Sequence, residues 1–582
     1  MTAPSTKALT ENARLVLERR YLQRDDAGRV VETPQGMFRR VAENVAQAED
    51  SYGGDAAAFA EQSYDLLSRL QFLPNSPTLM NAGLDIQQLA ACFVLPVEDS
   101  LPEIFDAIKY TALIHQSGGG TGFSFSHLRP ADDIVHSTRG VASGPVSFMQ
   151  VFDAATEAIK KGGARRGANM AILAIDHPDI EPFIRAKADH KTLTNFNLSV
   201  AVDDNFMQAE QHDDTVPLIN PRTGEQVAVR SARALLELIA EQAWQHGDPG
   251  LVFLDRVNAL NPTPQLGQIE STNPCGEQPL LPYESCNLGS LDVSKFVREG
   301  DLDWDRLADA VRLAIQFLDN VIDRSRYPAP EIKRMTRSTR KVGLGIMGFA
   351  DLLLLLRVPY DSEEGLAWAD RLMHFVQTRA NEASESLAAM RGVFPTWQGS
   401  IFANAGPRLR NATRTTIAPT GTISIIAGCS GGIEPVFAFH LLRRHYLDEN
   451  EPRRLLELSE THDGLRRVAT AEGWWSRRLV HHLEEGGTLR EWVDAPDWAR
   501  TAYVTAHEVA PEWHVRMQAT FQRHVDNGVS KTINFPATAT REEVAAAYRL
   551  AWREGCKGIT IYRDGSRRDQ ILARAAPEAD WR

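Results

Sequence analysis

The first 70 or so residues carry apolar positions at the spacing of helices. Met37, Val41 and Val45 follow one another at four-residue intervals, and an earlier apolar cluster lies at 15–22. Side chains four residues apart share one face of a helix. Residues 1–70 are therefore predicted to form an N-terminal helical segment.

From Leu73 onward, short apolar runs that end in Gly, Pro or Asn alternate with amphipathic stretches of fifteen or more residues. This alternation is typical of α/β proteins. The runs are apolar on both faces, which favours a mostly parallel sheet that is covered on both sides. The expected strands are 171–175, 198–202, 251–254, 342–346, 415–418, 423–426 and 559–562.

Two expected helices have clear ends. One begins after Ser100, with Pro102 in its first turn and Glu103 completing a capping box, and Gly118 stops it. The other covers 303–323. Residues 440–519 are rich in Arg, Glu and Trp, and we interpret them as a peripheral helical insertion. The charged, alanine-rich residues after Asp564 predict a loose tail.

Composition places the 582-residue chain among ordinary folded proteins, with 43% hydrophobic and 24% charged residues. The N-terminus lacks an apolar signal region and no run approaches the ~18 apolar residues of a membrane span, so a cytoplasmic location is expected. The net charge of −13 argues against a nucleic-acid polymer as partner. Small anions can still be bound locally by glycine-rich turns.

Residues 273–290 read NPCGEQPLLPYESCNLGS and carry the strongest chemical signal. Cys275 stands between Asn273 and Glu277, and the intervening Pro and Gly disfavour a helix, so a loop tip is expected. Cys286 is too distant for a CxxC pair or a metal knuckle, which indicates one reactive sulfur and a separate one. Five cysteines in so long a chain do not form a disulfide framework.

Several other segments have a functional and a structural interpretation. Cys429 and Cys556 are interpreted as small buried hydrophobes. Neither glycine-rich loop, 115–122 or 160–167, ends as a Walker A motif; the second carries four basic residues suited to phosphate or to a mobile specificity loop, or it is a solvated turn. Residues 418–424 place hydroxyls and N–H groups at a strand end where anions bind. Residues 343–348 match GxGxxG, but strand packing explains them better than dinucleotide binding.

The ordered motifs NPCGEQPL, SPTLMNAG (76–83), ACFVLPVEDS (91–100), GGARRGANM (162–170) and APTGTIS (418–424) resemble those of ribonucleotide reductases. RYLQRDDAGRVVETPQGMF (20–38), SKTINFP (530–536) and GCKGITIYRDGSR (555–567) resemble the adenosylcobalamin-dependent class II enzymes of dimeric type. The resemblance implies a ten-stranded α/β barrel of two five-stranded parallel halves around a central finger loop. It divides the chain into the helical segment 1–70, a barrel at 71–568 with the insertion at about 440–519, and a tail at 569–582.

The same resemblance implies roles for the cysteines. Cobalt–carbon homolysis yields a deoxyadenosyl radical that takes hydrogen from Cys275, and the resulting thiyl removes the 3′-hydrogen of the ribose. Glu277 acts as general base on the 3′-hydroxyl, and Asn273 holds the substrate. Cys92 and Cys286 protonate the leaving 2′-hydroxyl and end as a disulfide.

Binding residues are implied in the same way. The substrate set is Thr78, Ala91, Thr420, Gly421, Thr422, Ile423 and Ser424. The set for the deoxynucleotide effector, at a dimer interface, is Asp99, Ser100, Arg129, Gly162, Gly163, Ala164, Arg165, Arg166, Gly167 and Asn169. The loop at 162–169 links effector to substrate choice. Ser530, Lys531, Thr532 and Asn534 are weaker cobalamin candidates, and no protein ligand to a metal is expected.

The implied partners are ribonucleoside diphosphates, dNTP effectors, a second copy of the chain and a thioredoxin- or glutaredoxin-type reductant. No two of the eleven tyrosines are adjacent and no glycyl-radical motif occurs, which disfavours class I and class III. We expect no ATP-cone. A paired-cysteine tail is expected to be truncated here or supplied by another polypeptide. The alternatives are a class I-type large subunit that needs a metal-containing radical partner, and a catalytically silent nucleotide sensor.

Overall fold

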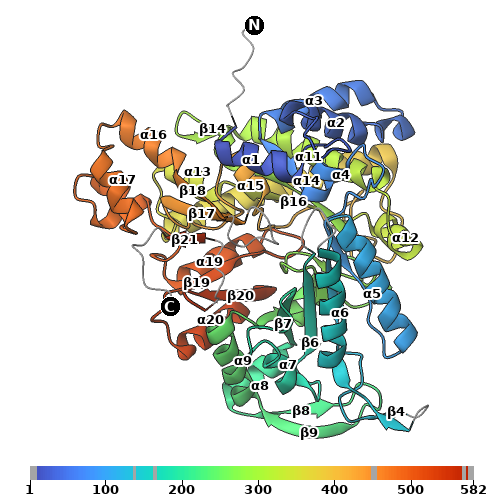
Figure 1. Cartoon of the computed structure of the whole chain (residues 1–582). Coiled ribbons are helices and arrows are strands. Elements are labelled where there is room, and N and C mark those ends of the chain that lie inside the picture. Colours follow the sequence, from blue (N-terminus) through green and yellow to red (C-terminus); the bar gives the residue numbers. More distant parts are fainter. Residues whose placement is uncertain (1–8, 136–138, 161–166, 447–454, 567–571, 575–582) are drawn as a thin grey trace.

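The computed structural model describes residues 9–135, 139–160, 167–446, 455–566 and 572–574 (Figure 1). The expected N-terminal helices are present as α1 (Glu11–Arg20), α2 (Pro34–Ala46) and α3 (Ala56–Ser68), followed by β1 (Phe72–Pro74). Each begins at a Thr or Asp whose side chain accepts a backbone N–H of the first turn. Met37, Val41 and Val45 are fully buried, as their spacing predicts.

The expected α/β barrel is confirmed, and its sheet has ten strands. Five of them form an all-parallel half in the order β2 (Cys92–Val94), β3 (Gly120–Ser124), β6 (Asn169–Ala174), β7 (Phe196–Val202) and β10 (Gly250–Phe253). The second half contains the parallel pairs β13 (Ser285–Asp292) with β16 (Val342–Met347), and β19 (Thr532–Phe535) with β20 (Gly558–Arg563). Antiparallel pairing of β2 with β13 and of β10 with β20 joins the halves.

Residues 415–418, expected as a strand, contribute only isolated bridges. Thr415 pairs with Leu344 of β16, and Ile417 pairs with Val529 just before β19. These two bridges connect the two pairs of the second half. Strand β1 is an addition, because it pairs antiparallel with β13.

Helices cover both halves of the sheet and bury two large apolar cores. Helices α2 and α3 pack against α11 (Trp304–Arg324), which packs in turn against α14 (Glu363–Arg391), over the second half at the top of Figure 1. Helix α5 ends at Gln116, before Gly118, and Ser100 caps it as expected. The main outer helices are α5 (Leu101–Gln116), α6 (Gly144–Lys160), α8 (Asp204–His212), α9 (Ala232–His246), α11 (Trp304–Arg324), α12 (Pro330–Thr339), α13 (Phe349–Leu356), α14 (Glu363–Arg391), α19 (Pro511–Gln522) and α20 (Arg541–Arg553).

Two further expectations need correction. Residues 423–426 are helix α15 (Ile423–Ala427) rather than a strand, because the apolar run is one short turn that starts beyond the strand end. The insertion is not all helical: β17 (His440–Tyr446) and β18 (Leu455–Thr461) pair with each other, and β21 (Leu572–Arg574), inside the expected loose tail, pairs with β17. Strand pairing overrides the helix propensity of Leu, Arg and Glu here.

The rest of the insertion forms a small unit of its own. Helices α16 (Asp463–Ala471), α17 (Arg477–Glu484) and α18 (Asp497–Ala502) surround a separate core that includes Leu465, Leu479 and Tyr503, with four tryptophans at its edge. Helices α16 and α17 project from one side of the molecule (Figure 1). Helix α19, by contrast, contributes Val515 and Met517 to the two main cores and belongs to the barrel.

A buried charge network fastens the N-terminal segment to the barrel. Asp319 of α11 is fully buried and accepts from Arg340 Nε at 2.9 Å, Arg391 Nη1 at 3.1 Å and Arg410 Nε at 3.3 Å. Burial alone would raise the pKa of Asp319, but the three guanidiniums lower it. Arg391 also donates to Glu49 of the N-terminal segment at 2.6 Å. No helix in the described parts of the chain is both long and apolar enough to cross a membrane.

Replacing Asp319 with Asn should lower the free energy of unfolding by about 3–5 kcal/mol, because three buried cations lose their shared counter-charge. Denaturant unfolding followed by tryptophan fluorescence measures this. The control is Asp65→Asn, which removes an exposed partner of Arg69 and should cost less than about 1 kcal/mol. Similar losses for both variants would contradict the role given to the network.

Candidate active site

Cys275 lies at the tip of a hairpin inside the barrel, as expected of a loop tip. Strands β11 (Ser271–Thr272) and β12 (Pro279–Leu280) pair antiparallel, and we call residues 271–280 the finger hairpin. Within its turn the Asn273 N–H donates to the Gln278 carbonyl at 3.1 Å, and Gly276 has a φ of 80°, which favours glycine. The Cys275 side chain is exposed, whereas its neighbours Asn273 and Glu277 are buried.

The two remaining predicted cysteines face each other across the seam between the barrel halves. Cys92 of β2 and Cys286 of β13 are direct partners in the antiparallel register, and both are thiols. Directly opposed residues in such a pair have Cβ atoms ~4.5–5.5 Å apart, close to the separation in a disulfide. The structure therefore brings together two thiols that are 194 residues apart in the sequence.

Asn273 connects the finger hairpin to this pair. Its Nδ2 donates to Cys92 Sγ at 3.1 Å, and its Oδ1 accepts from the Gln278 N–H at 3.0 Å. Burial raises the pKa of the Cys92 thiol well above its usual value, and the nearby Glu277, Cys286 and Cys275 raise it further. All five predicted catalytic side chains thus belong to one electrostatically connected site.

Glu277 has the properties of a general base. Burial raises its pKa to about 7, although a hydrogen bond from Asn273 acts in the opposite direction. Its Oε2 is buried and has no hydrogen-bond partner, so it is available to a ligand. The Glu277 carbonyl accepts from Thr416 Oγ1 and from the Gly528 N–H, both at 2.9 Å, which fixes the backbone.

The predicted phosphate segment borders a cavity of about 1610 Å³. Gly421 and Ser424 line it, while Thr420 is buried and its Oγ1 accepts the Gly432 N–H at 2.7 Å. Ala418, just before them, packs with Cys92 and Cys286. The thiols themselves do not line this cavity, so the 418–424 segment is what connects the two regions.

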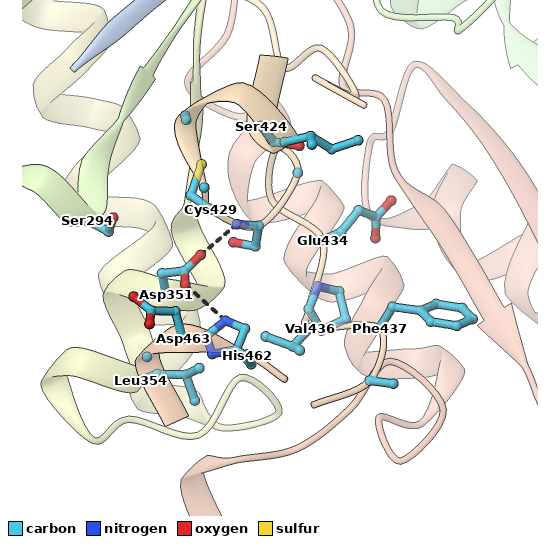
Figure 2. Close-up of a pocket in the computed structure, with 18 of the residues that line it drawn as sticks. Ser294, Asp351, Leu354, Ser424, Cys429, Glu434, Val436, Phe437, His462 and Asp463 are labelled. Carbon is cyan, nitrogen blue, oxygen red and sulfur yellow. Dashed lines mark hydrogen bonds and ion pairs between the residues drawn. The ribbon is translucent and has the colours of Figure 1, made fainter. Parts of the chain in front are cut away.

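Figure 2 shows part of the cavity lining, with Ser424 of this segment together with Asp351 and His462. Asp351 of α13 accepts the Ser430 N–H at 2.6 Å and lies 3.1 Å from His462 Nε2 of the insertion. Cys429 lies above Asp351 and is only partly buried, although it packs against the first large core, so its interpretation as a small buried hydrophobe holds only in part. Cys556, in contrast, is fully buried, as expected.

The weaker cobalamin candidates divide into two groups. Thr532 and Asn534 line the cavity. Lys531 does not, because its ammonium is buried between Glu434 and His514, with His514 Nδ1 at 2.9 Å. Ser530 is half-buried, and its N–H donates to the Ile417 carbonyl.

The remaining substrate candidates lie near the thiol pair. The Ala91 N–H donates to the Cys286 carbonyl at 3.1 Å. Thr78 is fully buried, and its Oγ1 donates to the Leu89 carbonyl at 2.9 Å. The described residues contain no group of three His, Cys, Asp or Glu side chains placed to hold a metal ion.

The effector candidates fall into three places. Arg129 and Asp99 form an ion pair at 2.8 Å beside the start of α5, where Ser100 is the cap. Gly162, Gly163, Ala164, Arg165 and Arg166 lie outside the described residues. Gly167 packs against the His115 ring, and Asn169 is buried, with its amide bonded to Thr121 and Thr156. Asn169 could therefore affect a bound effector only indirectly, through the residues it contacts.

Sequence reasoning missed Glu284 and Lys341, which form a buried ion pair of 2.6 Å beside Cys286. The available signal was the short spacing, since Glu284 stands two residues before Cys286, just ahead of β13. It also missed the buried Gln278, whose side-chain amide has no hydrogen-bond partner.

Known proteins share this architecture. The family model "Ribonucleotide reductase, all-alpha domain" matches residues 7–87, and "Ribonucleotide reductase, barrel domain" matches residues 90–562. A vitamin B12-dependent ribonucleoside-diphosphate reductase of Thermoplasma acidophilum is 48% identical over 98% of this chain and 81% of its own length. One of Mycobacterium tuberculosis (strain CDC 1551 / Oshkosh) is 50% identical over 97% and 80%. The Actinobacillus ureae class Id ribonucleotide reductase alpha subunit shares the fold, with a TM-score of 0.79 at 23% identity over 97% of this chain and 99% of that one.

Glu277 should make stability depend on pH. Because its folded pKa of about 7 exceeds the usual value of 4.5, the folded state holds its proton more tightly, and stability falls as pH rises from about 4.5 to 7. Glu277→Gln should abolish this loss. The free energy of unfolding of the variant minus that of the native chain should therefore be larger at pH 8 than at pH 4.5, by up to about 3 kcal/mol. The control is Glu61→Gln, at an exposed site, which should keep the native pH profile of stability. Equal pH profiles for Glu277→Gln and the native chain would contradict a raised pKa of the Glu277 carboxyl.

Proposed function

The chain belongs to the ribonucleotide reductase family, and we propose that it is a vitamin B12-dependent ribonucleoside-diphosphate reductase that uses adenosylcobalamin. The relatives from Thermoplasma and Mycobacterium support the activity and the cofactor. The observation that carries the chemistry is the contact between Asn273 and Cys92, because it joins the finger hairpin to the thiol pair.

The residues of the chain fit a bulky cofactor. The cavity of about 1610 Å³ exceeds the ~300–1,000 Å³ typical of small-molecule pockets. The buried hydroxyl of Ser430, which contributes to its lining, has no hydrogen-bond partner. Thr532, Asn534 and Tyr562 would hold the cofactor from the barrel side. When bound, adenosylcobalamin supplies the radical that removes the hydrogen atom from the Cys275 thiol.

The side chains of the chain then carry the reaction. The Cys275 thiyl takes the 3′-hydrogen atom of the ribose, and Glu277 accepts the proton of the 3′-hydroxyl. The 2′-hydroxyl leaves as water with a proton from the Cys92 and Cys286 pair. The pair supplies its second hydrogen to C2′ and ends as a disulfide, Glu277 returns its proton to the 3′-oxygen, and the Cys275 thiol returns a hydrogen atom to C3′. Burial raises the pKa values of Cys92 and Cys286 and so keeps both thiols protonated before the reaction.

The substrate would lie between the finger hairpin and the 420–424 segment. Thr420, Gly421, Thr422, Ile423 and Ser424 would hold its diphosphate, where the chain turns from a strand end into α15. Thr78 and Ala91 would lie near the sugar. A thioredoxin-type dithiol would then reduce the disulfide.

A homodimer would bring the effector residues together. Leu101, Phe105 and Ile108 follow at i, i+4 and i+7 along α5, and the first two are exposed. Exposed apolar stripes of this kind mark protein interfaces. The stripe begins beside Ser100 and the Asp99–Arg129 pair, so an effector bound there would lie at the interface.

The activity is tested by an anaerobic assay of the purified chain with adenosylcobalamin, CDP and a dithiol. We expect dCDP without any partner protein, and at least a ~1,000-fold loss in Cys275→Ser, because the thiyl is an obligatory intermediate. Cys556→Ser, which changes a buried thiol of the outer core, should retain activity. A requirement for a metal-containing partner would instead support a class I-type subunit, and full activity in Cys275→Ser would overturn the assignment.

Dimerisation is tested by Phe105→Glu, which places a charge in the exposed apolar stripe. Light scattering after size exclusion should show the native chain near twice its 64.6 kDa mass and the variant near that mass. Deoxynucleotide effectors should also bind the variant at least ~10-fold more weakly. Val493→Glu alters an exposed valine of the insertion and should remain dimeric; a dimeric Phe105→Glu would exclude this interface.

A further inference from the structure

A buried ion pair stands directly beside one of the two paired thiols. Lys341 Nζ lies 2.6 Å from Glu284 Oε2, and the two side chains are 1% and 0% exposed. Glu284 also accepts from Thr339 Oγ1 and from the Leu281 N–H, both at 2.8 Å. The pair is therefore fully enclosed, and its carboxylate is anchored from two further sides.

The strand register places this pair next to Cys286. Lys341 immediately precedes β16, whose first residue, Val342, pairs with Asn287, so Lys341 stands beside Cys286. Cys286 Sγ lies 3.6 Å from the Lys341 carbonyl. Glu284 lies one residue before β13 and two residues before Cys286, so the ion pair stands at the start of the strand that carries this thiol.

The charges around the two thiols differ. Burial raises the pKa of Cys286, Lys341 lowers it, and Glu284 and Glu277 raise it. Burial, Glu277 and the other two thiols raise the pKa of Cys92, whereas the hydrogen bond from Asn273 lowers it. Of the two sulfurs, Cys286 is thus the one with a lysine ammonium close by. It is also the less accessible, at 0% exposure against 4% for Cys92.

We propose that Lys341, held by Glu284, gives the Cys92–Cys286 disulfide a direction, so that a reducing dithiol attacks Cys92 and Cys286 leaves. This inference rests on the proposed function, because that reaction forms the disulfide. Lys341 is a positioning residue that acts through Cys286. Accessibility and charge favour the same assignment, since the more exposed sulfur is attacked and the departing negative charge develops beside the ammonium.

The thiol–disulfide exchange between the dithiol and the Cys92–Cys286 disulfide has two steps. One thiolate of the dithiol bonds to Cys92 Sγ, the Cys92–Cys286 bond breaks, and its electron pair remains on Cys286 as a thiolate, which then takes a proton from solvent. The second thiol of the dithiol loses its proton and attacks its own partner sulfur in the mixed disulfide. Cys92 leaves with the electron pair and is protonated. The dithiol is oxidised to a disulfide, and both active-site thiols are restored.

A purely structural role explains the ion pair less well. Apolar residues of similar volume in place of a buried ion pair are often neutral or stabilising by ~1–4 kcal/mol, so the pair is weak evidence for stability. A cation beside a leaving thiolate, in contrast, changes the rate of exchange directly. Lys557, another buried lysine, donates to the Asp526 and Asn527 carbonyls, and burial lowers its pKa to about 8, with a smaller lowering by the charge of Lys341.

The direction of attack is measured by trapping the first step. In a Cys275→Ser background, the full chain is oxidised with diamide and exposed briefly to 2-mercaptoethanol. It is then acid-quenched, and the released thiol is alkylated. Peptide mass mapping should find the mercaptoethanol on Cys92 and the alkyl group on Cys286 with at least a ~10-fold preference. If mercaptoethanol were found mainly on Cys286, or equally on both cysteines, this result alone would overturn the proposal.

The role of the ion pair is tested by the double variant Glu284→Gln/Lys341→Met. We expect the preference to fall to about threefold or less and the first-step rate to fall about tenfold, with the native pH dependence of that rate altered. The control Lys187→Met/Asp248→Asn removes another ion pair, of 2.8 Å, and should retain the native preference and rate. An unchanged preference in the first double variant would exclude Lys341 as its cause.

Failure of the proposed function is recognised separately. With Cys275 intact, one turnover of CDP with adenosylcobalamin and no reductant should produce the Cys92–Cys286 disulfide. If that disulfide does not form, the proposed function fails. If it forms but the trapped sulfur is not Cys92, only the inference about Lys341 fails.

Discussion

The active site depends on the passage of a hairpin through the interior of a closed barrel. A Cβ on Gly122 of β3 would lie 1.7 Å from the Thr272 carbonyl oxygen, and one on Gly120 would lie 2.9 Å from Pro274. From the other barrel half, a Cβ on Gly528 would lie 2.7 Å from the Gly276 carbonyl oxygen. The finger hairpin fits because the walls carry no side chain at these three positions. The same close fit fixes Asn273 against Cys92 and holds Glu277 in place.

Enclosure of this kind also sets the electrostatics. Burial keeps the thiols of Cys92 and Cys286 neutral and raises the pKa of Glu277 to about 7, near the range in which a base both exists and is strong enough to act. A water-filled site would leave these groups near their ordinary values. The buried Glu284–Lys341 pair is the exception, because it keeps two full charges inside the same core. Its position beside only one of two otherwise similar thiols is what distinguishes them.

Local periodicity predicted the α/β alternation and the helical start, and residues that exclude a helix predicted the tip position of Cys275, whereas the barrel itself was implied by the family resemblance. The sequence pattern assigned 423–426 to a strand, since an apolar run of four residues does not distinguish a strand from one helical turn. The glycines at 343 and 345 were correctly attributed to strand packing, and a Cβ on Gly345 would lie 2.4 Å from the Thr416 carbonyl oxygen. The proximity of Lys341 to Cys286 was not predictable, because it depends on the register of two strands 55 residues apart.

One carboxylate ties the insertion to the cavity wall. Asp351 belongs to a barrel helix, yet it binds the Ser430 N–H after α15 and lies 3.1 Å from His462, just before α16 of the insertion (Figure 2). Burial alone would raise the pKa of Asp351, but these hydrogen bonds lower it and keep it ionised. His462 Nδ1 in turn accepts the Leu465 N–H at 3.2 Å and so caps α16. The cavity wall, the turn after residues 418–424 and the insertion are thus fixed to one another by a single half-buried anion, and movement of any one of them would disturb the other two.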